Sequence, residues 1–127
     1  MNLLLDSCAM LDIAVGAPTL TEQAKSGFEN ATNNVYLSSA SIWELGLKRS
    51  LGTLDFDVAG LAALLPSMGI QVLDIDLQIA LLVNQLPYHH KDPFDRIIIS
   101  TAKAQSLTVI TSDAIFAEYG VDVIACR

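Results

Sequence analysis

Short apolar runs alternate along the chain with segments in which apolar residues recur every three or four positions. The helical spacing is clear from Leu61 to Met68 and from Ile79 to Leu86. Strands that are buried on both faces and joined by helices are typical of a parallel sheet. The pattern predicts an α/β domain of three layers (α/β/α), with a central, mainly parallel sheet of about five strands. The predicted strands lie at 3–5, 35–37, 70–75, 107–110 and 121–124.

The chain has the composition of one folded domain. It has 127 residues, of which 52% are hydrophobic and 17% are charged, and this excludes a disordered chain. No repeat or linker divides it, so we predict a single domain over residues 1–127. No apolar run approaches the roughly 20 residues of a membrane helix, and the first residues lack the basic region of a signal peptide. We expect a cytoplasmic protein that does not contact a membrane.

The charge balance is acidic. Lys and Arg number 7 against 14 Asp and Glu, so the formal net charge is −7. Proteins that coat nucleic acid carry a basic surface, because they neutralise phosphates. This composition therefore argues against nucleic-acid binding unless another group, such as a metal ion, supplies positive charge.

Two acidic residues are predicted at the same edge of the sheet. Asp6 directly follows the first strand, and Asp113 follows the fourth strand after Thr111 and Ser112. Ligands of parallel α/β sheets bind beyond the carboxyl ends of the strands, where the strand order reverses. If the first and fourth strands are neighbours, these two carboxylates come close together.

Two further acids begin helices near that edge. Glu44 lies in the first turns of the helix after the second strand, although Ser41-x-x-Glu44 also fits a capping box, in which the glutamate serves the helix N-terminus. Asp92 before Pro93 is typical of an N-cap with proline at the first helical position. Asp95 then falls in the first turn and close to the core, where an unpaired carboxylate is unfavourable.

Four carboxylates at one edge of a sheet repel one another, which raises their pKa values and lowers stability. Either Lys and Arg residues pair with them or they bind a hard divalent cation, which prefers oxygen ligands. Few bases are near in the sequence, so we favour Mg²⁺ or Mn²⁺. The four residues are Asp6, Glu44, Asp95 and Asp113.

Four segments in register resemble the PIN-domain ribonucleases, and among them the VapC-like toxins of bacterial toxin–antitoxin modules. The resemblance covers nearly the whole chain. The segments are Leu3-Leu4-Leu5-Asp6-Ser7, Leu37-Ser38-x-Ala40-Ser41-x-Trp43-Glu44-Leu45, His90-x-Asp92-Pro93-Phe94-Asp95-Arg96 and Val109-Ile110-Thr111-Ser112-Asp113-x-x-Phe116-x-x-Tyr119.

The resemblance implies a parallel sheet flanked by helices and a metal site built from acidic residues. It also implies endonucleolytic cleavage of RNA, a tightly bound antitoxin that silences the enzyme, and a homodimer. Carried over by motif, Asp6, Asp95 and Asp113 would hold the Mg²⁺ or Mn²⁺ ion, and Glu44 would complete the catalytic set by orienting water. Two hydroxyls would support the site, those of Ser7 and Thr111.

Other polar residues near these motifs are candidates for contact with RNA. Two histidines in the loop before Asp92, His89 and His90, are either phosphate contacts, weak metal ligands or solvated loop residues. Trp43 is expected to pack in the core rather than to stack on RNA. The bases expected to contact the RNA backbone are Lys48, Arg49, Lys91 and Arg96.

Two other functions compete with a nuclease. A phosphohydrolase of the haloacid-dehalogenase kind also places an acid after its first strand, but it needs a second Asp where this chain has Cys8. A non-catalytic PIN-like domain that binds proteins would use its acids only as helix caps. Stabilisation by Mg²⁺ or Mn²⁺ separates the two classes, because a binding site gains stability from its ligand and a cap gains nothing.

Overall fold

The computed structural model describes residues 1–127 and contains a five-stranded parallel sheet in the order β3-β2-β1-β4-β5. Each predicted apolar run supplies one strand, so the prediction of a mainly parallel sheet of about five strands is confirmed. The strands are β1 (Asn2–Leu5), β2 (Asn34–Ser38), β3 (Ile70–Leu73), β4 (Thr108–Thr111) and β5 (Val123–Ala125).

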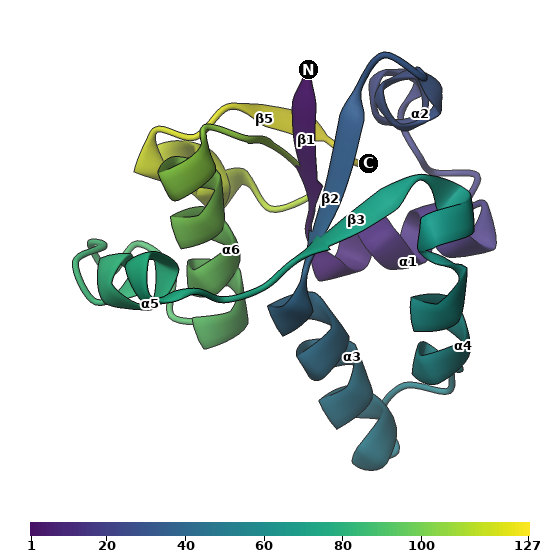
Figure 1. The fold of residues 1–127 in the computed structure, drawn as a ribbon, viewed down its shortest axis with the longest axis horizontal. Helices are drawn as coiled ribbons and strands as arrows, with labels where there is room; N and C mark the ends of the chain where they lie inside the picture. The colour runs from purple at the N-terminus through teal and green to yellow at the C-terminus, as the bar shows by residue number, and fades with distance from the viewer.

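Helices cover both faces of the sheet, with α5 and α6 on one side and α1, α2 and α4 on the other (Figure 1). No helix in the structure is both long enough and apolar enough to span a bilayer. The α-helices are α1 (Ser7–Val15), α2 (Glu22–Glu29), α3 (Ser39–Ser50), α4 (Val58–Leu64), α5 (Leu77–Val83) and α6 (Pro93–Gln105), and the 3₁₀ helices are η1 (Pro66–Met68) and η2 (Ala114–Tyr119).

The strand at the centre of the sheet is buried on both faces. Leu3 and Leu5 belong to the larger apolar core, which lies against α1, α2 and α4, whereas Leu4 belongs to the smaller core against α6. Successive side chains of a strand point to opposite faces, so β1 joins the two cores. This double burial explains why the run has no polar residue until the strand ends at Asp6.

The order of the strands reverses beside β1. The chain passes from β1 through β2 to β3 on one side of the sheet, and then returns to add β4 and β5 on the other. Leu5 pairs with Ile110, and the Asp6 N–H donates to the Ile110 carbonyl at 3.2 Å. The carboxyl ends of β1 and β4 are therefore neighbours at the switch point, where parallel α/β sheets bind ligands.

Candidate active site

Asp6 lies at the end of β1 and also begins α1. One carboxylate oxygen, Oδ1, accepts the Ala9 N–H at 2.7 Å, which is an N-cap, and Oδ2 accepts the Thr111 hydroxyl from the end of β4. The side chain is buried, and burial raises the pKa of Asp6, although both hydrogen bonds act in the opposite direction. Thr111 thus supports a site acid, as we expected of a second hydroxyl there.

Glu44 does not cap the helix that carries it. The α3 helix begins at Ser39, and its N-cap is Ser38, whose hydroxyl accepts the Ala40 N–H at 3.0 Å. The capping-box interpretation of Glu44 is therefore wrong, because the helix starts earlier than that motif requires. Glu44 is buried instead against α1, where it accepts the Ser7 hydroxyl, and its Oε2 lies 3.4 Å from the Lys48 ammonium.

The start of α6 follows the prediction from the Asp-Pro pair. Asp92 is the N-cap, and its Oδ1 accepts the N–H groups of Phe94 and Asp95 at 2.8 and 3.3 Å. Asp95 then lies in the first turn, mostly buried. Burial raises the pKa of Asp95 to about 7, and the negative charges of Asp92, Glu44 and Asp6 add to this shift. The sequence predicted an unfavourable position for this carboxyl close to the core, and its raised pKa agrees with that prediction.

The two carboxylate oxygens of Asp113 have different roles, since one caps η2 and the other faces the acidic region. Its Oδ1 accepts the Ile115 N–H at 3.0 Å and so caps η2, while its N–H donates to the Thr111 hydroxyl. The other oxygen, Oδ2, points away from η2 toward the first turn of α6. One oxygen of Asp113 therefore takes no part in capping a helix.

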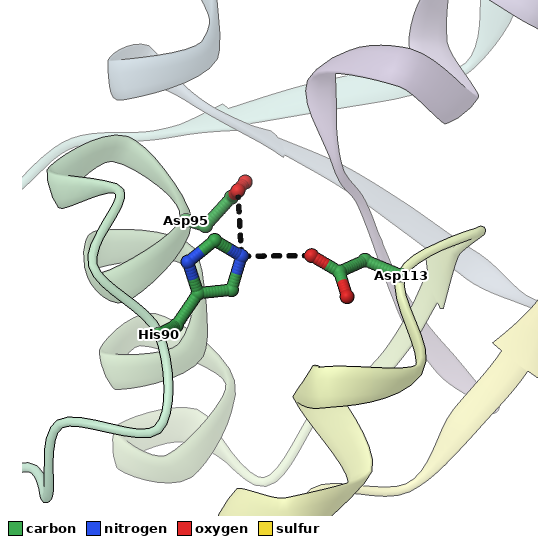
Figure 2. Close-up of side chains that lie close together, drawn as sticks. All are labelled: His90, Asp95 and Asp113. Atoms are coloured by element: carbon green, nitrogen blue, oxygen red, sulfur yellow. Dashed lines mark hydrogen bonds and ion pairs between the residues drawn. The ribbon is translucent and has the colours of Figure 1, made fainter.

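His90 lies between Asp95 and Asp113, as Figure 2 shows. Its Nε2 is 2.7 Å from Asp113 Oδ2 and 3.1 Å from Asp95 Oδ2, and its side chain is 13% exposed. His89 has its ring on the surface, 3.8 Å from Glu118. The sequence alone did not separate the two histidines. The signal that could have distinguished them is the spacing of His90 from the N-cap Asp92, because the Asp92 N–H donates to the His90 ring.

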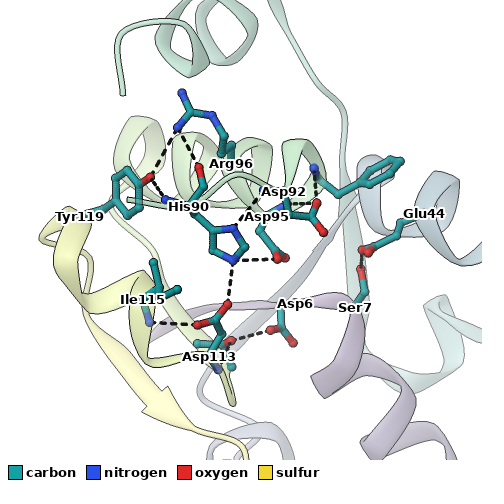
Figure 3. A network of polar contacts seen from close by, with 12 residues as sticks. Asp6, Ser7, Glu44, His90, Asp92, Asp95, Arg96, Asp113, Ile115 and Tyr119 are labelled. Atoms are coloured by element: carbon teal, nitrogen blue, oxygen red, sulfur yellow. Dashed lines mark hydrogen bonds and ion pairs between the residues drawn. The ribbon is translucent and has the colours of Figure 1, made fainter. Parts of the chain in front are cut away.

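The four predicted acids surround one region beyond the carboxyl ends of β1 and β4 (Figure 3). Glu44 and Asp113 raise the pKa of Asp6, and Glu44 and Asp6 raise that of Asp95, so the carboxyls repel one another. The most compact set of donor atoms, all within 4.8 Å of one another, comes from His90, Asp95 and Asp113. Carboxylate oxygens with excess negative charge suit Mg²⁺ or Mn²⁺, so the carboxyls of this region fit a divalent ion.

Comparison with known proteins identifies the family. Residues 3–122 match the PIN domain model. The chain belongs to the PIN-domain family. The sequence comparison with curated proteins found no match.

Solved structures resemble this PIN domain over nearly its whole length. VapBC2 from Rickettsia felis, bound to a DNA fragment from its promoter, has a TM-score of 0.76 at 15% identity, with 100% of both chains covered. FitAcB from Neisseria gonorrhoeae has a TM-score of 0.69 at 23% identity, covering 97% of this chain and 96% of that one. VapBC-5 from Mycobacterium tuberculosis, of the VapBC family of toxin–antitoxin systems, has a TM-score of 0.63 at 22% identity, with 97% of both chains covered.

The expectation that Arg96 of this PIN domain contacts RNA requires correction. The residue is 4% exposed, and its guanidinium donates to the carbonyl oxygens at the end of α5 and in the loop before α6. These acceptors are the carbonyls of Val83, Leu86, Pro87 and His90, at 2.9–3.3 Å. Arg96 therefore holds the loop that carries His90 and offers nothing to a phosphate.

The three other predicted RNA contacts lie on the surface. Lys48 and Arg49 are about half exposed, but Arg49 also donates to the Phe56 carbonyl at 2.6 Å and lies 3.6 Å from Asp57. Lys91 is exposed in the loop between His90 and Asp92. Lys48 and Lys91 flank the acidic region from α3 and from the α6 loop, respectively.

The prediction that Trp43 packs in the core is wrong. The side chain is 59% exposed and contacts the Phe94 ring edge-on, with the ring centroids 4.8 Å apart. Glu44, its neighbour in α3, points inward and fills the position toward α1 instead. An aromatic pair therefore lies where α3 meets the start of α6, next to two of the site acids.

Proposed function

We propose that this PIN domain is a divalent-metal-dependent endoribonuclease that hydrolyses phosphodiester bonds of RNA in the cytoplasm. One observation carries the proposal. Acids from four separate segments meet at the switch point of the sheet, where their basic partners are Lys48 beside Glu44 and the His90 imidazole beside Asp95 and Asp113. Burial, and after it the neighbouring negative charges, raise the pKa of Asp95 to about 7, and a bound cation would favour the ionised carboxylate.

The geometry divides the roles among the residues. A bound Mg²⁺ or Mn²⁺ ion supplies positive charge to polarise a phosphate and to activate water. Asp95 and Asp113 present oxygens that belong to no helix cap, and Asp6 adds its charge from the end of β1. Glu44, held at Oε1 by Ser7, is placed to orient the attacking water and to accept its proton.

The substrate must reach a site on an acidic protein. Lys48 and Lys91 flank the site and are exposed, so they are the bases placed to receive the RNA backbone. Since the formal net charge of the chain is −7, attraction to nucleic acid in general stays weak. Recognition of a particular RNA shape then decides the target.

We further propose that the chain is the toxin of a toxin–antitoxin pair and that two copies form a homodimer. Complexes named for toxin–antitoxin systems are among the structures that it resembles. The surface supports protein partners, because large apolar side chains stand exposed in two places. Those on α3 and the residue after it are Trp43, Leu47 and Leu51, and those on α5 are Leu77 and Leu81.

Cleavage of RNA by purified variants tests the enzymatic part. We expect Asp6→Asn and Asp95→Asn each to abolish Mg²⁺-dependent and Mn²⁺-dependent cleavage while their circular dichroism spectra match the wild type. The matched control is Asp122→Asn, because this exposed residue precedes β5 at the opposite edge of the sheet. Full activity in Asp95→Asn, or cleavage that persists in excess chelator, would contradict the mechanism.

Expression in cells tests the toxin. We expect the chain alone to arrest growth, and co-expression with the product of the neighbouring gene to restore it. Mapping the ends of cellular RNA during arrest then identifies the target. Growth arrest by Asp95→Asn as strong as that by the wild type would point instead to a non-catalytic interaction domain.

A further inference from the structure

The backbone before α6 determines which nitrogen of His90 carries hydrogen. The Asp92 N–H donates to His90 Nδ1 at 3.1 Å. A ring nitrogen that accepts a hydrogen bond has no hydrogen of its own, so the neutral imidazole carries its hydrogen on Nε2. The N-cap residue of α6 thereby selects the tautomer of the histidine two positions before it.

The Nε2–H points at the oxygens that a cation would use. The Nε2 atom is hydrogen-bonded to Asp113 Oδ2 at 2.7 Å, and Asp95 Oδ2 lies 3.1 Å from the same nitrogen. A nitrogen that carries hydrogen has no lone pair for a metal ion. In this tautomer His90 donates to Asp113 Oδ2, lies beside Asp95 Oδ2 and competes with an ion for this position.

The backbone of His90 is anchored more firmly than its ring. Its N–H donates to the Tyr119 hydroxyl at 2.7 Å, and its carbonyl accepts from Arg96 at 3.3 Å. The ring makes an edge-on contact with Phe116 at a centroid distance of 6.1 Å. Because the side chain is partly exposed, rotation of the ring toward solvent requires no change in the anchored backbone.

We propose that His90 is a positioning residue that stands in for the divalent ion: its Nε2–H holds the Asp113 carboxyl beside Asp95 in the metal-free protein and releases it when the ion binds. The inference rests on the proposed metal site and assigns a role to a residue that is neither one of the four acids nor a ligand. It also accounts for the convergence of the two carboxyls on one imidazole nitrogen.

This arrangement has a measurable consequence for metal affinity. An ion that binds Asp95 and Asp113 must first displace the hydrogen bond from His90 to the Asp113 carboxylate, and its loss weakens binding. Removing the imidazole removes the competitor. Hydrogen bonds to charged groups contribute enough for us to expect roughly tenfold tighter binding without it.

Titration calorimetry with Mn²⁺ tests the inference. We expect His90→Ala to bind Mn²⁺ about tenfold more tightly than the wild type. His89→Ala is the matched control, because the neighbouring imidazole lies on the surface and should leave the affinity unchanged. Unchanged or weaker binding by His90→Ala would overturn the stand-in role.

Nitrogen NMR of the imidazole rings in the wild-type protein gives a second test that needs no variant. We expect His90 to be the Nε2–H tautomer in the metal-free protein, and Mg²⁺ to shift its Nε2–H resonance while the resonances of His89 stay in place. An Nδ1–H tautomer without metal, or a His90 spectrum indifferent to Mg²⁺, would overturn the inference.

The two proposals fail in different ways. If the wild type binds Mn²⁺ and Asp95→Asn does not, the metal site stands and the His90 variant decides the further inference alone. If the wild type binds no Mn²⁺ at all, the metal-dependent nuclease is wrong and the stand-in role falls with it.

Discussion

The two halves of the acidic site are held in different ways. The strand half (Asp6, Ser7, Glu44 and Thr111) is buried, and each of its carboxyls accepts a buried hydroxyl from another segment. The loop half (His90, Asp95 and Asp113) is more exposed, and its two carboxyls lie on either side of one imidazole nitrogen. The sheet therefore positions the strand half without an ion, whereas the geometry of the loop half depends on what lies between its carboxyls.

The largest loss of stability is expected when the loop before α6 loses its contacts with Arg96. We expect Arg96→Met to lower the free energy of unfolding by about 3 kcal/mol or more, because four carbonyl groups lose the buried guanidinium that satisfies them. Urea unfolding measures the loss. Arg49→Met is the control, since half of that side chain is exposed and the change should stay within about 0.5 kcal/mol. A similar small change in Arg96→Met would mean that the loop holds itself.

The pH dependence of stability tests the charge of the loop half. The pKa of Asp95 is raised to about 7 in the folded chain, from about 4 in the unfolded one, so the folded state binds the extra proton between these values. Stability of the metal-free protein should therefore fall as pH rises from about 4 to 7, by about 5 °C or more in Tm. We expect Asp95→Asn to flatten this slope. An equally steep slope in that variant would assign the effect to another group.

The strand half should lose stability when one of its hydroxyls is removed. We expect Thr111→Val to lower the free energy of unfolding by about 1–2 kcal/mol, because Asp6 stays buried and loses a hydrogen bond. Thermal unfolding with and without Mn²⁺ measures both effects. The loss should be the same in either condition, and its disappearance on adding Mn²⁺ would mean that the two halves are not independent.

The smallest expected effect is at the cap of α6. Asp92→Ala removes the acceptor of two N–H groups, and we expect it to destabilise the fold by about 1 kcal/mol. Asp92→Asn keeps an acceptor oxygen and should recover most of that stability. No difference between the two variants in thermal unfolding would show that the cap contributes little.

The fold was predictable where burial leaves a pattern. Because β1 is buried on both faces, its run of leucines indicates a strand, and the reversal of strand order places Asp6 and Asp113 together. The α2 helix escaped prediction because Ala24 is its only buried residue, so its sequence carries almost no apolar spacing. Pro66 divides the spacing from Leu61 to Met68 into α4 and η1, since proline has no N–H for a helix interior.

The site was predictable in its acids and less so in its other residues. The positions of the four carboxyls follow from strand ends and helix starts, which local sequence reports. The partners of Arg96 are carbonyls of a loop that folds back over it, and no side-chain pattern records carbonyl positions. Similarly, the difference between His89 and His90 depends on the turn before α6, which places one ring inside the acidic region and its neighbour outside.

Two of the four site acids also cap a helix, and the other two do not. This difference affects how related sequences are to be interpreted. Asp6 begins α1 and Asp113 begins η2, so both carboxyls would be retained for folding in a descendant that had lost its activity. Glu44 and Asp95 accept no capping N–H, and a degenerate copy has no folding reason to keep them. Surveys for active members should therefore score positions 44 and 95 above the more conspicuous aspartates.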